Sequence, residues 1–252
     1  MTISSLIPHP SSLIIFLAAF FAGIINSIAG GGTLLSFPSL IWIGRNAILA
    51  NATSTVALWP GSFSGMLGFR RDLATLPHRL YLLVIPSLIG GIAGAVLLLH
   101  TSTKTFERLV PWLILGATVL FALQGVITKL TPHRWPLSAI LILQLLVGLY
   151  GGYFGAGIGI LMLAALGLMG LTDVHQMNGL KNLLAICING VAAIYFAASG
   201  AVIWLDAGLM AIAAILGGFA GAKLAHRLGR KFVRGAVIVI GVVMTIALAL
   251  KS

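Results

Sequence analysis

The chain has 252 residues, of which 60% are apolar and only 8% are charged. A soluble domain carries about a quarter charged residues, so this composition excludes a protein that covers itself with a wetted polar surface. Apolar stretches recur from end to end, and about 20 apolar residues cross a bilayer core of about 30 Å. The sequence therefore predicts an all-α integral membrane protein that crosses the bilayer many times.

The net charge of +11 would suit a protein that binds nucleic acid. Here the basic residues lie in short segments between apolar runs, where the positive-inside bias and anionic lipids account for them. We therefore expect membrane lipid, and no nucleic acid, as a partner. The single cysteine, Cys187, lies within an apolar run and forms neither a disulfide nor a cysteine metal site alone.

The first apolar region, residues 12–43, is too long for one span and is interrupted by Gly30, Gly31 and Gly32. Glycine lowers helix propensity and permits backbone angles closed to other residues. We therefore expect a helical hairpin or broken helix that enters the membrane and returns. Three full spans are expected after it, at about 47–69, 80–99 and 109–128.

The second half of the chain has the same order of segments. Residues 137–170 form another long apolar region, interrupted by Gly155, Gly157 and Gly159. Three more spans are expected after it, at about 174–199, 204–224 and 234–250.

The two glycine-broken regions resemble each other in sequence. Three glycine pairs align at a spacing of 125 residues: Gly23 with Gly148, Gly30 with Gly155, and Gly32 with Gly157. The chain is therefore predicted to be an internal duplication, with repeats at 1–130 and 131–252 forming one integrated membrane domain. A hairpin adds no net crossing, so each repeat crosses an odd number of times and the second copy should be inverted.

The basic residues test this topology. With the N-terminus outside, the loops at 70–79, 129–134 and 225–234, together with Lys223, become cytoplasmic and hold ten of the 15 Lys and Arg residues. This excess of Lys and Arg is the one expected of cytoplasmic loops. The charge distribution therefore supports a topology with both termini outside. The exterior then receives Arg45, Lys104, Arg108 and Lys251.

Inverted repeats with paired broken helices are typical of secondary transporters, which bind their substrate near the midplane. A break is tolerated there only where protein or a watery cavity receives the freed backbone groups, so both breaks should face inward. Helices that begin near Thr33 and Ile158 would aim their N–H groups and positive dipole ends at an anion. Close helix packing also uses small residues, but two glycine clusters in matching positions favour a site.

Lys181 is the basic residue that lies well inside an expected span, about 10 Å along its helix at 1.5 Å per residue. A cation within the membrane marks a functional site by default, so we expect Lys181 to be the counter-charge of a bound anion. The alternative is that its side chain reaches back to the cytoplasmic interface, toward Asp173. The candidate substrate-binding residues are Asn26, Gly30, Gly31, Gly32, Thr33, Asn51, Thr53, Ser54, Thr55, Gly155, Gly157, Ile158, Asn178, Lys181 and Asn182.

Other chemistry has little support in the sequence. The six histidines and four carboxylates fall in loops or at segment ends, so we expect no metal site, no cofactor and no catalytic residues of an enzyme. A carboxylate proton relay through the membrane centre is likewise not expected. If transport is coupled to protons, Lys181, His175 or the substrate itself must carry them.

The motifs resemble those of a known family. Residues 22–33, Pro38 and residues 51–55 resemble the first repeat of the TauE/SafE family of membrane permeases, and residues 148–159 with 178–182 resemble its second repeat. The second break departs from a triple glycine, because Ala156 stands between Gly155 and Gly157. The family is associated with export of sulfite and with movement of sulfonates such as sulfoacetate across the bacterial inner membrane. The resemblance implies a permease for such an anion in the bacterial inner membrane. The termini, which the charge asymmetry puts outside, would then be periplasmic.

Two other functions fit the same residues. An anion channel would use the same dipoles and lysine to line a pore. A structural membrane subunit needs no substrate at all. The sequence is also compatible with a homo-oligomer.

Overall fold

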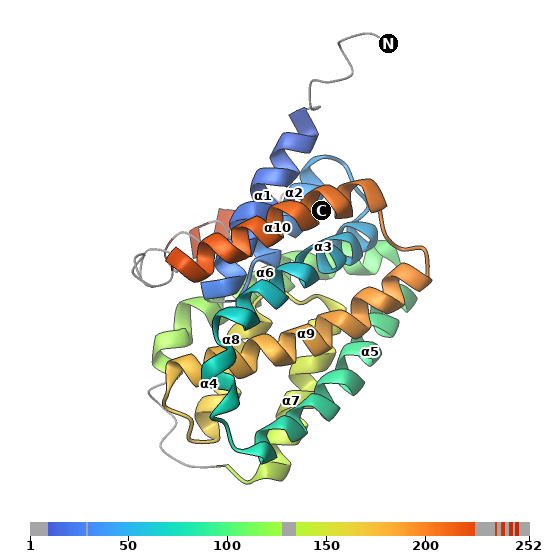
Figure 1. Cartoon of the computed structure of the whole chain (residues 1–252). Helices are drawn as coiled ribbons and strands as arrows, with labels where there is room; N and C mark the ends of the chain where they lie inside the picture. Colours follow the sequence, from blue (N-terminus) through green and yellow to red (C-terminus); the bar gives the residue numbers. More distant parts are fainter. Residues whose placement is uncertain are drawn as a thin grey trace.

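The computed structural model describes residues 10–28, 30–127 and 135–224, with a few isolated residues beyond them. All regular structure in these ranges is helical, as Figure 1 shows. The predicted span at 234–250 and the basic loops at 129–134 and 225–234 lie outside the described ranges. The helices are α1 (Pro10–Ile28), α2 (Thr33–Trp42), α3 (Ala47–Gly68), α4 (Arg70–Ala74), the 3-10 helix η2 (His78–Leu83), α5 (Val84–His100), α6 (Thr103–Ile127), α7 (Leu137–Tyr153), α8 (Ile158–Leu168), α9 (Val174–Ala198) and α10 (Trp204–Leu224).

The two glycine-broken regions form pairs of helices, as the sequence predicts. Helices α1 and α2 occupy the first region, and α7 and α8 the second. The expected span at 80–99 differs in its first turns, which are the 3-10 helix η2. Pro86 has no N–H to donate to the carbonyl of Leu82, so the α-helical hydrogen-bond pattern is interrupted there.

The outer surface of the bundle suits a lipid environment. Three described helical segments are long and apolar enough to cross a membrane, His78–His100, His175–Ala198 and Trp204–Gly221. Exposed apolar side chains recur at helical spacing on two of them, a pattern that presents one continuous apolar face. They are Ile85, Ile89 and Ile92 on α5, and Ile212, Leu216 and Phe219 on α10.

Helices α3 and α9 pack against each other at the centre of the bundle. Helix α1 lies along α10, which also packs on α3, and α7 lies along α5, which also packs on α9 (Figure 1). Trp59 of α3 links the two central helices, because its Nε1–H donates to the carbonyl of Ile186 in α9 at 3.1 Å. Gly190 leaves room for the indole, because a Cβ there would lie 3.1 Å from Nε1.

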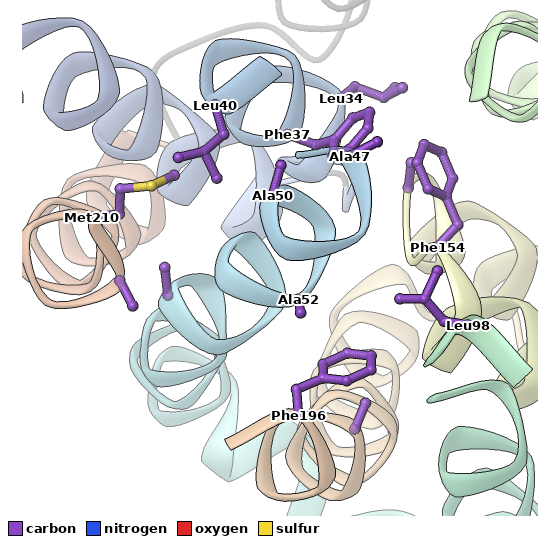
Figure 2. Close-up of a cluster of buried hydrophobic side chains, with 14 of the residues drawn as sticks. Leu34, Phe37, Leu40, Ala47, Ala50, Ala52, Leu98, Phe154, Phe196 and Met210 are labelled. Atoms are coloured by element: carbon purple, nitrogen blue, oxygen red, sulfur yellow. The ribbon is translucent and has the colours of Figure 1, made fainter. Parts of the chain in front are cut away.

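One buried cluster connects the two hairpins with the long helices. Figure 2 shows Phe37 of α2, Phe154 at the end of α7 and Phe196 of α9 among its members. Small residues on α3, Ala50 and Ala52, are fully buried between them and allow the neighbouring helices to approach closely. The polar side chains of α3 lie in the same interior, so a helix with a polar middle avoids exposing it to lipid.

An ion pair joins the two halves of the chain at one end of the bundle. Arg45, in the connection from α2 to α3, donates from Nε to Asp206 Oδ2 at 2.7 Å and from Nη2 to Oδ1 at 3.2 Å. Asp206 lies in the first turn of α10, and its side chain is only 6% exposed, against 40% for Arg45. The two-point geometry fixes the direction in which the α2–α3 connection meets α10.

Replacing Asp206 with asparagine should lower the free energy of unfolding by about 1.5–3 kcal/mol, the range for hydrogen bonds to charged groups. The half-exposed guanidinium places the effect toward the lower end. Unfolding in detergent of Asp206→Asn, Arg45→Gln and the double variant measures the coupling between the two side chains. Strictly additive effects of the two substitutions would contradict this interpretation.

Candidate anion-binding site

A small cavity of about 30 Å³ lies in the interior, where both glycine breaks reach the long central helices. A buried water needs about 10–15 Å³ by this kind of measure, so the space holds two or three waters. It is lined from the first hairpin by Asn26, Ser27, Gly30, Gly31 and Thr33, from the second by Gly155, Ile158 and Gly159, from α3 by Thr55, Leu58, Gly61 and Ser62, and from α9 by Lys181, Asn182, Ala185 and Asn189.

The two breaks touch each other beside this cavity. Gly30 has a φ of +72°, and a Cβ on it would lie 2.8 Å from the Cα of Gly159. Gly155 has a φ of +77°, and the Thr33 hydroxyl lies 4.0 Å from the position of its missing Cβ. Only glycine combines a left-handed backbone with so little space, which explains why both breaks consist of this residue.

The two breaks are nevertheless built differently. Asn26 Oδ1 accepts hydrogen bonds from Gly31 N at 3.1 Å and from Gly32 N at 2.8 Å, and so satisfies the amides ahead of α2. The position that aligns with Asn26 in the second repeat is Gly151, and no described side chain caps the break ahead of α8. The first break therefore offers fewer N–H groups to an anion than expected, and α8 has the more open N-terminus.

Replacing Asn26 with alanine should destabilise the fold by about 1–3 kcal/mol, because it leaves two buried amides without an acceptor. Ser27→Ala is the matched control, since Ser27 is the next residue, is buried, and its hydroxyl has no hydrogen-bond partner among the described residues. Thermal unfolding of the two variants in detergent makes the comparison. An Asn26 variant as stable as the Ser27 variant would show that the cap does not stabilise the break.

Lys181 lies in the third turn of α9 and is 1% exposed. It lines the central cavity, and no carboxylate is found among the described residues that line it. Asp173 instead caps α9, accepting from the backbone N–H groups of His175 at 2.8 Å and Gln176 at 3.3 Å. The structure thus places the lysine in the cavity rather than at the interface beside Asp173.

Two neutral polar groups add to the lysine. Asn182 Nδ2 and Ser27 Oγ are buried, and neither has a hydrogen-bond partner in the part of the chain that the structure describes. Both residues line the cavity, as does Asn189 about two turns farther along α9. Buried polar groups are almost always hydrogen-bonded, so both groups are available to bond to a molecule in the cavity.

Nine of the predicted site residues line the cavity and six do not. Three of the six hold helices together around it. Asn51 Nδ2 donates to the carbonyl of Tyr153 at 3.0 Å, and Thr53 Oγ1 accepts from Ile203 N at 3.0 Å. Ser54 Oγ lies 2.7 Å from Ser36 Oγ. The residues outside the lining are Gly32, Asn51, Thr53, Ser54, Gly157 and Asn178.

The predicted site omits several lining residues. Most follow a predicted residue at helical spacing: Leu58 and Ser62 come three and seven positions after Thr55, and Ala185 and Asn189 come three and seven after Asn182. Residues three, four and seven apart share one face of a helix, so this periodicity could have found them. The others are Ser27, Gly61 and Gly159.

Comparison with known proteins agrees with the resemblance seen in the motifs. The model of the family described as sulfite exporter TauE/SafE matches residues 15–248. The chain belongs to this family. No solved structure matches the chain.

Relatives of the TauE/SafE chain match it along nearly its whole length. It is 28% identical over 243 residues to a probable membrane transporter protein of Haemophilus influenzae, covering 92% of both chains. It is 29% identical to the probable membrane transporter protein YfcA of Escherichia coli K12, covering 95% of this chain and 90% of the relative. A probable membrane transporter protein of Sinorhizobium, ORF9, is 29% identical over 238 residues. The family and these relatives make the chain a membrane-transporter homologue.

Proposed function

We propose that the chain is a secondary transporter that moves a small oxyanion, with sulfite as the first candidate, across the bacterial inner membrane. The observation that carries the proposal is the central cavity, where the two glycine breaks meet beside Lys181. The substrate would lie between the two hairpins, with the α9 side chains beneath it.

The charges around the cavity favour an anion. Lys181 supplies a buried cation, and a bound anion would offset the unfavourable desolvation of that charge. The N-termini of α2 and α8 begin at the cavity wall, at Thr33 and Ile158, and each contributes the positive end of a helix dipole. Asn182 adds a neutral donor, so the site combines charge with directional hydrogen bonds.

The size of the cavity favours a compact substrate. A volume of about 30 Å³ takes two or three waters and suits sulfite, which has four non-hydrogen atoms, better than a longer sulfonate such as sulfoacetate. Without Lys181 the lining would be neutral and polar, and it would bind water as readily as these anions.

The packing of the helices supports the inverted repeat. If α1, α3 and α5 correspond to α7, α9 and α10, exchanging the repeats turns the α1–α10 contact into the α7–α5 contact. The same exchange turns the α3–α10 contact into α9–α5 and leaves the α3–α9 contact in place. A site at such a repeat interface can be opened to either side by rocking one repeat against the other.

Flux measurements in proteoliposomes test the proposal. We expect sulfite uptake that saturates and shows counter-flow, with both termini accessible from the periplasmic side in labelling experiments. Flux that never saturates would favour an anion channel. A protein that neither transports sulfite or sulfoacetate nor is stabilised by them would favour a structural subunit. A rate that responds to an imposed pH gradient would establish proton coupling.

A further inference from the structure

A second, larger cavity of about 620 Å³ opens where the α2–α3 connection meets the start of α6. Three basic residues line it, Arg45, Lys104 and Arg108, together with Glu107. This is the end of the bundle that the charge asymmetry predicts to be periplasmic. No residue of this cavity lines the central one.

The charge of this outer cavity is positive even after the nearby carboxylates are counted. Asp206 engages Arg45, so Lys104 and Arg108 face Glu107 as the remaining acid. Neither of them forms an ion pair with Glu107 within the described part of the chain. Lys104 and Arg108 are four residues apart on α6 and share one face, where two like charges repel unless an anion lies between them.

The outer cavity leads toward the central one along α2. Phe37 lines the outer cavity, and Thr33, one turn earlier on the same helix, lines the central cavity. Phe154 directly precedes Gly155, another residue of the central lining. The two spaces therefore approach each other across the rings of Phe37 and Phe154, which Figure 2 labels.

These rings belong to a closed aromatic layer. Phe37 lies 5.4 Å from Phe154 and 6.4 Å from Phe106, and Phe106 lies 6.2 Å from Phe154, all as edge-on pairs between ring centroids. All three side chains are at most 1% exposed. Phe106 lies between Lys104 and Arg108 in sequence and is buried where they are exposed, so one stretch of α6 supplies both a ring of the aromatic layer and the cations of the outer cavity, which Phe37 also lines.

We propose that the outer cavity is a second anion site, in which Lys104 and Arg108 hold a small oxyanion next to the aromatic layer that closes the central cavity. The identity of the oxyanion rests on the proposed function. In this arrangement the outer site concentrates the substrate on one side of the barrier, and the central site binds it once the rings move apart. A soluble oxyanion, rather than the phosphate group of a lipid, is the proposed occupant.

The test compares sulfite transport by wild-type protein and by the double variant Lys104→Gln/Arg108→Gln in proteoliposomes, with sulfite supplied at the outer-cavity face. We expect the variant to raise KM about 10-fold, the low end of electrostatic effects on capture, with a much smaller effect on the maximal rate. High salt should reduce the difference. The control is Arg70→Gln/Arg71→Gln, which removes two exposed cations from the opposite end of the bundle and should leave KM unchanged.

A binding measurement separates the two sites. In a Lys181→Met background, purified protein in uncharged detergent should still bind sulfite weakly, and the added Lys104→Gln/Arg108→Gln change should abolish that binding. If the wild type transports sulfite and the Lys104→Gln/Arg108→Gln variant has the same KM, the outer site is overturned and the proposed transporter function still stands. Native mass spectrometry tests for a bound lipid. If the Lys104→Gln/Arg108→Gln variant loses bound phosphatidylglycerol that the wild type retains, while its sulfite binding is intact, the cavity binds lipid and the proposal is overturned. A wild type that transports no sulfite at all would refute the proposed function instead.

Discussion

Replacing Lys181 with methionine is expected to lower the rate of sulfite transport by about 10- to 100-fold, the range for losing one hydrogen bond to a charged group. Methionine keeps the length and apolar stem of the side chain and removes its charge. Because Lys181 is 1% exposed at the wall of the central cavity, no solvent counter-charge can substitute for it. The loss should appear in binding as well, as a weaker thermal stabilisation by sulfite.

The measurement is the initial rate of sulfite uptake at equal amounts of reconstituted protein. Arg71→Met is the control, because it removes a cation from an exposed position on α4, away from the cavity. The methionine variant should elute as folded protein and unfold at the same or a higher temperature, since replacing a buried charge by an apolar side chain is often neutral or stabilising. Unchanged kinetics in a folded Lys181→Met protein would refute the role given to the lysine.

Replacing Gly30 with alanine should destabilise the fold and stop transport. A left-handed backbone costs about 1–2 kcal/mol for a residue with a Cβ, and forcing an extra methyl into a packed interior adds about 1–3 kcal/mol. The new Cβ would meet the Cα of Gly159 at 2.8 Å, and backbone on both sides leaves no flexible side chain to move away. The two breaks would have to separate, and the cavity between them would lose its shape.

Gly200→Ala separates the two contributions. Gly200 has a φ of +70°, like Gly30 in the left-handed region, but no atom lies within 4 Å of the Cβ position. It should therefore show only the backbone term, and it should transport normally. Unfolding in detergent and flux in proteoliposomes measure both variants. Equal effects of the two substitutions would mean that the contact between the breaks does not stabilise the site.

Much of the fold follows from local pattern. The apolar runs predicted α3, α5, α9 and α10 to within a few residues, because the length of a membrane helix is set by bilayer thickness. The glycine clusters predicted where the two hairpins break, because glycine acts on the backbone at its own position. The charge at Lys181 was equally visible, since a cation stands out against an apolar run.

The tertiary structure was needed to separate binding residues from structural ones. Asn26 and Asn182 look alike as asparagines in apolar segments, yet one caps its own hairpin and the other presents its amide to the cavity. Asn51 and Thr53 stand in the same run as Thr55, but their partners Tyr153 and Ile203 are 102 and 150 residues away. Polarity within a span predicts that a side chain faces the interior, and it does not identify the group it meets there.

The apolar lengths, the glycine breaks and the buried lysine are properties of single segments, so the sequence by itself determined that the protein is a membrane bundle with two broken helices and a cation among them. The contact between Gly30 and Gly159, the ion pair between Arg45 and Asp206 and the aromatic layer of Phe37, Phe106 and Phe154 join segments from different helices. Such contacts depend on how helices cross and on which small residues let backbones approach. The sequence predicted that the two breaks and Lys181 belong to one site, and for that reason only the tertiary structure decided which residues touch there.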